Sequence, residues 1–140
     1  MLRTACLFLL LPACAQVYEL PAPAPIADAG NDQLLRYFVP GVLVGLDGRA
    51  SCDPLGRSIV HYEWWLHDWP SNSFASITSE DGVHATFTAD VEGRFVVALA
   101  VEAGGLLSPP DEVLIEVRAD AEHVIEPSVP DQNRCGEALD

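Results

Sequence analysis

Residues 46–56 form a short polar stretch between two apolar segments and read Leu46-Asp47-Gly48-Arg49-Ala50-Ser51-Cys52-Asp53-Pro54-Leu55-Gly56. Its two glycines give the backbone the freedom that tight turns need. The side chains of Asp47, Ser51 and Asp53 are short acceptors of the kind that satisfy turn amides. The stretch therefore predicts an ordered turn region between two strands, in which the carboxylates serve the backbone.

The segments on both sides of this turn region alternate with a period of two, as strands with one buried face do. No segment shows a helical period. Apolar residues occupy every second position in four segments: Val42, Val44 and Leu46; Tyr62, Trp64 and Leu66; Phe95, Val97, Leu99 and Val101; Val113, Ile115 and Val117. Several short strands separated by turn residues predict an all-β protein, an immunoglobulin-like antiparallel β-sandwich of about seven strands over residues 26–118.

Five strings in chain order resemble the polycystic-kidney-disease (PKD) domain family. They are the opening string over residues 27–33, the hallmark turn over 46–56, the central strand with Tyr62, Trp64 and Leu66, the segment 87–97, and the entry to the last strand over 108–113. The chain departs from the better-known members at residues 67–73, where a longer loop with Pro and Ser replaces a short Gly-containing turn. It resembles a branch of the family in this loop.

The resemblance implies an Ig-like sandwich that contacts proteins or carbohydrates, or that spaces other modules apart. It does not imply catalysis, and a fold alone does not settle function. Some PKD-like domains bind calcium near the end that holds the hallmark turn, and Ca²⁺ takes about 6–8 oxygen ligands. The donors available for such a site are Asn31, Asp32, Asp47, Asp53 and Asp111. We expect these acids to form turns rather than to bind metal.

The first residues have the layout of a secretory signal peptide, with Arg3 at a positive start and an apolar core over residues 6–11. The string Leu11-Pro12-Ala13-Cys14 resembles a bacterial lipobox, which implies cleavage after residue 13 and lipidation of Cys14. Acyl chains such as palmitate each contribute about 0.8 kcal/mol per buried methylene, so several chains hold firmly. The alternative is ordinary cleavage near Ala13 or Ala15, which would leave a soluble periplasmic or secreted protein.

These signals divide the chain into four parts. Residues 1–13 are the expected signal peptide, and residues 14–25 are the expected lipidated Cys with a tether, because alternating Pro and Ala favours an extended chain. Residues 26–118 are the expected PKD-like sandwich. Residues 119–140 are polar and acidic and are expected to be a flexible tail.

The composition excludes several classes of protein. The 140 residues carry 21 acidic groups and 7 Lys or Arg, a formal net charge of −14, so we do not expect nucleic-acid binding. An apolar content of 49% is too high for a disordered acidic chain. No apolar run reaches the roughly 18 residues of a membrane-spanning helix. Attachment through the lipid at the cell outer membrane, or residence in the periplasm, is the expected location.

Two cysteines remain after the expected processing. Cys52 and Cys135 would stand in an export compartment, where disulfides persist. A bond between them is feasible, because residues 119–135 can extend over about 56 Å and fold back along the sandwich. Two free thiols, or an intermolecular bridge through Cys135, are the alternatives.

The tryptophans offer a candidate binding surface. Trp64 lies in phase with the apolar positions of its strand and is expected in the core. Trp65 is out of phase, and Trp69 follows in a loop, so both are candidates to stack on sugars or to anchor a protein partner. The alternative is that they cover each other or the loop beside them.

No pattern indicates catalysis or a zinc site. The four histidines have no metal-ligand spacing, and no nucleophile stands at a known distance from a base. We therefore expect a non-catalytic cell-envelope lipoprotein whose PKD-like domain binds a protein or acts as a scaffold, without a cofactor other than the calcium candidate. The alternatives are a carbohydrate-binding module that uses Trp65 and Trp69, or a calcium-stabilised adhesin. The expected partners are the membrane, through the lipid anchor, and an envelope protein or polysaccharide.

Overall fold

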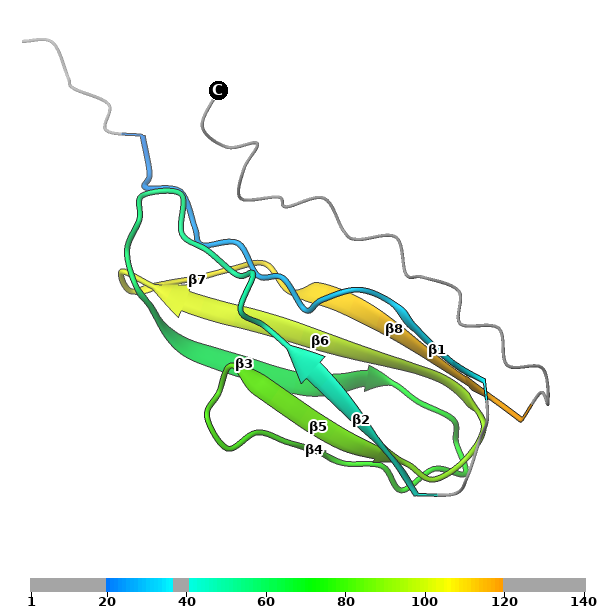
Figure 1. The fold of residues 1–140 in the computed structure, drawn as a ribbon. Coiled ribbons are helices and arrows are strands. Elements are labelled where there is room, and N and C mark those ends of the chain that lie inside the picture. The colour runs from blue at the N-terminus through cyan, green and yellow to red at the C-terminus, as the bar shows by residue number, and fades with distance from the viewer. Residues whose placement is uncertain (1–19, 37–40, 120–140) are drawn as a thin grey trace, which may run out of the picture.

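The computed structural model describes residues 20–36 and 41–119, which form two packed β-sheets (Figure 1). The all-β, immunoglobulin-like prediction is confirmed. Two of the strands, β4 and β7, have only two residues each, and they bring the count above the expected seven. The strands are β1 (Gln33–Arg36), β2 (Val42–Asp47), β3 (Ile59–Asp68), β4 (Ile77–Thr78), β5 (His84–Ala89), β6 (Gly93–Ala103), β7 (Leu106–Leu107) and β8 (Asp111–Arg118).

The larger sheet has the order β1-β8-β6-β3, with β7 also paired to β6, and the smaller sheet has the order β2-β5-β4. All pairs are antiparallel except β1 with β8, which run parallel with Gln33 opposite Ile115. Within the described strands, β3 is therefore one edge of the larger sheet. Figure 1 shows the two layers, with β2, β5 and β4 on one side of the core.

The core lies between the layers and consists of the alternate residues that the sequence predicts. Phe87 on β5 and Phe95 on β6 meet at its centre, with ring centroids 5.2 Å apart and ring planes tilted by 40°. Such tilted contacts contribute about 0.5–1.5 kcal/mol beyond the burial of area. The other buried strand residues are Val44, Leu46, Ala85, Ala89, Val97, Leu99, Val101, Ala103, Val113, Ile115 and Val117.

Trp64 packs against this core from β3, as its phase predicts. Its indole Nε1 donates a hydrogen bond of 2.8 Å to the carbonyl of Gly82. Gly48 of the hallmark turn lies directly beside it, because a Cβ at Gly48 would stand 3.1 Å from the Trp64 ring and 3.0 Å from Leu99. A side chain at Gly48 would therefore require its neighbours to shift by a few tenths of an ångström.

The hallmark turn and the start of the domain close one end of the sandwich. Ile26 and Cys52 form an antiparallel bridge, with N–O distances of 2.7 and 2.9 Å. β8 ends at the opposite end, where Val117 stands beside Gly93. The chain therefore enters the domain at one end, and the loops that follow β3 and β5 lie at the other (Figure 1).

Several predictions from the sequence fall outside the described residues. These are the signal peptide, the lipidation of Cys14, and Cys135 with the acidic segment from residue 120 onward. Cys52 is described and is disulfide-bonded. Among the described residues, no helix is long and apolar enough to cross a membrane.

The position of the core generates a stability prediction. We expect Phe87→Ala to lower the free energy of unfolding by about 3–5 kcal/mol, because it removes a ring from a close-packed core. Leu43→Ala on the neighbouring strand is the matched control, because Leu43 is 68% exposed, and it should stay within about 0.5 kcal/mol of the original protein. Urea denaturation measures both, and equal losses would contradict the assignment of the core.

Candidate functional site

Asp53 organises the hallmark turn. Its side chain has no exposed surface, and its Oδ2 accepts hydrogen bonds from the backbone amides of Leu55 at 3.1 Å and Arg57 at 3.0 Å. The Arg57 guanidinium binds both carboxylate oxygens, at 2.8 Å through Nε and 2.6 Å through Nη2. These bonds from Arg57 lower the pKa of Asp53 to about 2. Arg57 also donates to the carbonyl of Pro23 at 2.8 Å and so fastens the incoming chain.

Two further acids fasten the opening string to the last strand. The amide of Ala29 donates to Asp111 Oδ2 at 2.9 Å, and the amide of Leu114 donates to Asp32 Oδ1 at 2.8 Å. Each bond joins residues 82 positions apart in the sequence. These carboxylates hold distant parts of the backbone together.

The five calcium candidates are not gathered into one cluster. Asp47 pairs with Arg49, whose side-chain hydrogen bond lowers the pKa of Asp47, and Asp53 pairs with Arg57. Asp32 and Asp111 accept backbone amides, and Asn31 precedes Asp32 in the opening string. Within the described ranges, no group of three or more His, Cys, Asp or Glu could hold a metal ion. Asp47 and Asp53 satisfy turn amides, as the sequence predicts.

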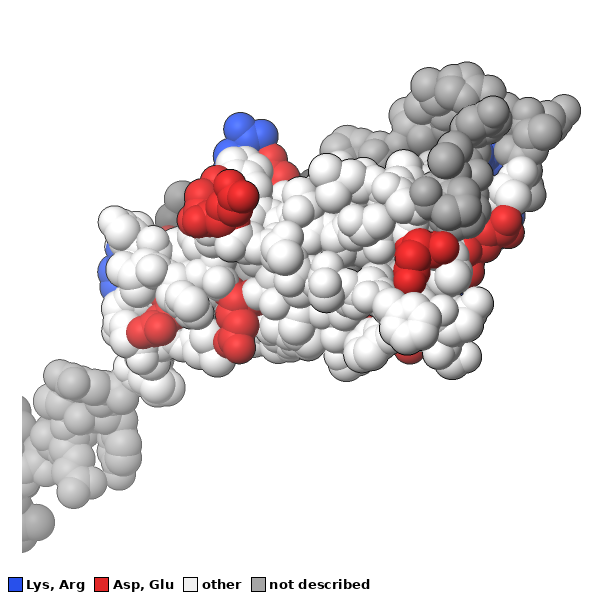
Figure 2. Space-filling model, turned by 90° about the horizontal axis from the view of Figure 1, so that it is seen from below, with Lys and Arg blue, Asp and Glu red and all other residues white. Residues whose placement is uncertain are grey.

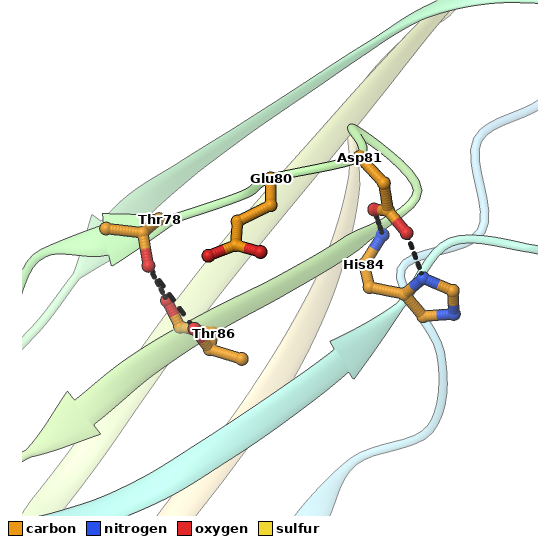
Figure 3. Close-up of a pocket in the computed structure, with 5 residues that line it drawn as sticks. All are labelled: Thr78, Glu80, Asp81, His84 and Thr86. Atoms are coloured by element: carbon orange, nitrogen blue, oxygen red, sulfur yellow. Dashed lines mark hydrogen bonds and ion pairs between the residues drawn. The ribbon is translucent and has the colours of Figure 1, made fainter.

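A shallow hollow of about 380 Å³ lies on the smaller sheet, between β4 and β5 (Figure 3). Thr78 and Thr86 face each other across the two strands, with their hydroxyl oxygens 3.3 Å apart, and Glu80 lies beside them. Asp81 points toward His84 at the other side of the hollow. The lining side chains are polar, and none of them is a Trp, Tyr or Phe of the kind on which sugars commonly stack.

Each of the two ring nitrogens of His84 lies near a carboxylate. Nδ1 lies 2.6 Å from Asp81 Oδ2, and Nε2 lies 3.7 Å from Asp47 Oδ1. The side-chain hydrogen bond from His84 lowers the pKa of Asp81. The nearby hydroxyl of Ser79 donates to the backbone carbonyl of His84 and accepts from Gly82, so it is directed to backbone groups and not to the imidazole. The group ties the β4–β5 turn to β2.

Trp65 and Trp69 occupy different surroundings. Trp65 is half-buried on the outer face of the larger sheet, where its register neighbour on β6 is the small residue Ala98. On the same outer face, His67 Nε2 approaches Glu112 Oε1 to 3.5 Å. Trp69 is 45% exposed and begins the loop after β3. The structure therefore leaves Trp69 accessible and only part of Trp65.

Residues 69–74, here called the aromatic end loop, carry a side chain that the sequence analysis did not single out. Phe74 is 92% exposed, whereas Phe87 and Phe95 are buried. Its amide donates to Asp90 Oδ2 at 2.6 Å, and the neighbouring Ser73 hydroxyl donates to Asp90 Oδ1 at 2.5 Å. The bond from the Ser73 hydroxyl, and to a lesser degree that from the Phe74 amide, lower the pKa of Asp90. A single Phe within a polar loop was the only signal available in the sequence.

Comparison with known proteins supports the fold. No family model matches the sequence, and no curated protein matches it. The solution structure of the PKD domain from the KIAA 1837 protein matches with a TM-score of 0.55 and 25% identity, over 77% of this chain and 100% of that one. The described residues form a PKD-like domain. The resemblance noted from the sequence strings is thereby confirmed at the level of the fold.

A second solved structure has the same fold in part of its chain. It is a nucleoside hydrolase-related hypothetical protein from Saccharophagus degradans, described as associated with carbohydrate metabolism. The match has a TM-score of 0.55 and 24% identity, and covers 69% of this chain but 26% of that one. Because the identity is low and the matched region is only 26% of the larger protein, this likeness concerns the fold alone.

The Asp53–Arg57 pair predicts a specific dependence of stability on pH. The folded-state pKa of Asp53, about 2, lies below its ordinary value of 3.8. Its contribution is therefore present above about pH 4 and is lost as the pH falls through about 2. We expect Asp53→Asn to melt at a lower temperature than the original protein at pH 7, and the difference to shrink between about pH 4 and pH 2.

Asp47→Asn is the matched control for this experiment. Asp47 also pairs with an arginine, but both side chains are exposed, and exposed ion pairs contribute little. Its melting temperature should stay close to that of the original protein at every pH. Melting curves recorded by circular dichroism from pH 7 to pH 2 decide the matter. A constant gap between Asp53→Asn and the original protein over this whole range would refute the proposed role of the carboxylate.

Proposed function

We propose that this chain is a non-catalytic cell-envelope lipoprotein whose PKD-like domain binds a protein partner or acts as a scaffold. One observation carries the proposal. The buried or clamped acids, such as Asp53 and Asp90, bind groups of the fold itself, whereas large apolar side chains are presented to solvent on an ordered loop. Such a division suits binding, because exposed aromatic residues anchor partners.

The polar hollow gives no support to a catalytic alternative. Both ring nitrogens of His84 are directed to carboxylates, and the Ser79 hydroxyl is directed to the backbone. A nucleophile needs a base within hydrogen-bond reach to be activated. The contacts of His84 with Asp81 and Asp47 instead link the β4–β5 turn to β2, which is a structural role.

The direction of the chain fits an anchored module. Arg57 fixes Pro23 at the end that holds the hallmark turn, and Leu20 is 89% exposed where the described chain begins. A lipid on Cys14 would therefore place the hallmark end nearer the membrane. The aromatic end loop would then face away from it. We propose the outer membrane or the periplasmic space as its location, with secretion in soluble form as the alternative.

The lipid anchor is tested by intact mass. We expect the full chain, made in a bacterial host with its own leader, to begin at Cys14 and to carry a diacylglyceryl-type mass addition. Cys14→Ser should abolish the addition and release the protein from the membrane fraction. Cys6→Ser is the matched control and should change neither, because it lies in the expected signal peptide. An unmodified mass starting at another residue would remove the lipoprotein proposal.

The same preparation tests the cysteine pairing. If Cys14 carries lipid, the partner of Cys52 in the mature chain is Cys135. Thiol labelling before and after reduction should then find no free thiol before reduction and two after it. A free Cys135 in a chain lipidated at Cys14 would contradict this pairing.

A carbohydrate-binding role is a second candidate, favoured by the exposure of Trp69. Aromatic rings stack on sugar rings, and Trp65 lies on the adjoining strand. We expect retention on insoluble cell-wall polysaccharide to be lost when Trp65 and Trp69 are both replaced by Ala. Pull-down with washed polysaccharide measures this retention. Binding that survives the double replacement would eliminate this candidate.

A further inference from the structure

We propose that the aromatic end loop, with the exposed ring of Phe74, is the docking surface for a protein partner that offers an apolar pocket bordered by Lys or Arg. The inference rests on the proposed function as a binding module and names the surface and the partner chemistry. It is carried by the exposure of Phe74, the rigidity of its support and the charge around it.

The exposure of Phe74 is the first observation. The side chain is 92% exposed, and the loop also presents Trp69 at 45%. The other phenylalanines of the described sandwich strands, Phe87 and Phe95, are buried in the core. Phe74 therefore adds no packing to the fold, and a phenyl ring fully in water is available to fill a pocket on another protein.

The support of the loop is the second observation. Asp90 holds it from the turn after β5, with one carboxylate oxygen on the Ser73 hydroxyl and the other on the Phe74 amide. Inside the loop, the Ser73 amide donates to the Pro70 carbonyl at 2.9 Å, and the Ala75 amide donates to Ser73 Oγ at 3.1 Å. The backbone that carries the ring is thus ordered before any partner binds, which reduces the entropy lost on association.

The loop also rests directly on the β5–β6 turn. Gly93 has a φ of 141° in that turn, and a Cβ there would lie 2.6 Å from Cγ of Pro70. Only glycine leaves room for the Pro70 ring at this contact. The loop and the turn therefore form one rigid end of the domain, at the opposite end from Pro23 and the hallmark turn.

The charge around the loop is the third observation. Asp68 precedes it, and Asp90 and Glu92 lie in the turn on which it rests. Loop and turn together, residues 68–75 and 90–93, contain no Lys or Arg. Arg94 comes next in the chain, opposite Glu116 of β8, and Arg118 at the end of β8 is paired with the same Glu116. Figure 2 shows one face of the domain, on which separate groups of acidic side chains stand between areas of uncharged surface. An apolar tip with an acidic border is complementary to an apolar pocket with a basic border.

Two other kinds of occupant fit the loop less well. A sugar needs polar side chains beside the ring, but both carboxylate oxygens of Asp90 are bonded within the loop, which leaves the loop only the neutral side chains of Ser71 and Asn72 to offer. An anionic membrane surface would be repelled by Asp68 and Glu92, and the basic residues that attract such surfaces are absent from loop and turn. A protein partner satisfies both constraints.

Site-specific photo-cross-linking in the native host tests this surface. The photoreactive amino acid p-benzoylphenylalanine replaces Phe74 in one version of the full chain and Leu107 in another. Leu107 is the matched control, because it is apolar and 56% exposed. It lies on β7 opposite Glu102, at the other end of β6 from the aromatic end loop. Cross-linked products are identified by mass spectrometry, and the attachment point in the partner is mapped to a peptide.

We expect a discrete protein adduct at position 74 that is absent at position 107, attached within an apolar segment of the partner that has Lys or Arg beside it. Attachment to lipid or polysaccharide, or an equal pattern at the two positions, would overturn the inference. A discrete protein adduct at position 107 alone would overturn it as well, but would leave the broader binding role standing. No protein adduct at either position would count against both.

Binding to the identified partner gives the quantitative test. Phe74→Ser should weaken the affinity by about thirtyfold, the loss typical of a central anchoring residue, whereas Leu107→Ser should leave it unchanged. Melting curves should show no loss of stability for Phe74→Ser, since the ring is exposed. Full affinity in Phe74→Ser would overturn the docking surface, and a reduced affinity in Asp90→Asn would support the role of the clamp.

Discussion

Phe87 from the smaller sheet and Phe95 from the larger one meet at the centre of the sandwich, and burying one apolar face of each sheet is the constraint that organises the rest of the molecule. Each strand must bury alternate side chains between the sheets. Polar side chains are therefore found on the outer faces and at the two ends of the sandwich. Gly48 shows how closely the parts pack, because a Cβ at this position would stand only 3.0 Å from Leu99 and 3.1 Å from the Trp64 ring.

Carboxylates complete the structure at the ends, where the strands no longer pair. Asp53 holds the hallmark turn and, through Arg57, the incoming chain at Pro23. Asp90 does the same at the far end, where it holds the loop that carries Phe74. Several aspartates of this strongly acidic chain, among them Asp32, Asp53, Asp90 and Asp111, thus act as acceptors for backbone amides. This supports the proposed binding role, because an end loop held in this way presents its side chains in one conformation.

The sequence was sufficient to predict the features that depend on local periodicity. The alternation along Tyr62-Glu63-Trp64-Trp65-Leu66 correctly placed Trp64 against the core and Trp65 on the outer face. The turn-forming acids of the hallmark stretch and the β-sandwich itself were also predicted. Both rest on signals, turn residues and a period of two, that are contained in short segments of the sequence.

Features that depend on long-range contacts were not predictable in this way. The Asp90 clamp joins residues 16 positions apart, and the bond from Ala29 to Asp111 joins residues 82 apart. No spacing rule connects such pairs. Phe74 was missed for the same reason, because exposure of a single loop residue depends on what the fold brings beside it. The calcium candidates were likewise not separable by sequence. Asp32, Asp53 and Asp111 look equivalent there, but their carboxylates accept hydrogen bonds from different parts of the backbone.

Amide hydrogen exchange tests most directly whether carboxylates hold the backbone at the two ends. The measurement follows the amides of Ala29, Leu114 and Phe74, whose acceptors are the carboxylates of Asp111, Asp32 and Asp90. We predict slow exchange at all three, including Phe74, although its side chain is exposed in a loop. Exchange of the Phe74 amide at the rate of an unstructured peptide would contradict an ordered, carboxylate-held loop and the docking surface built on it.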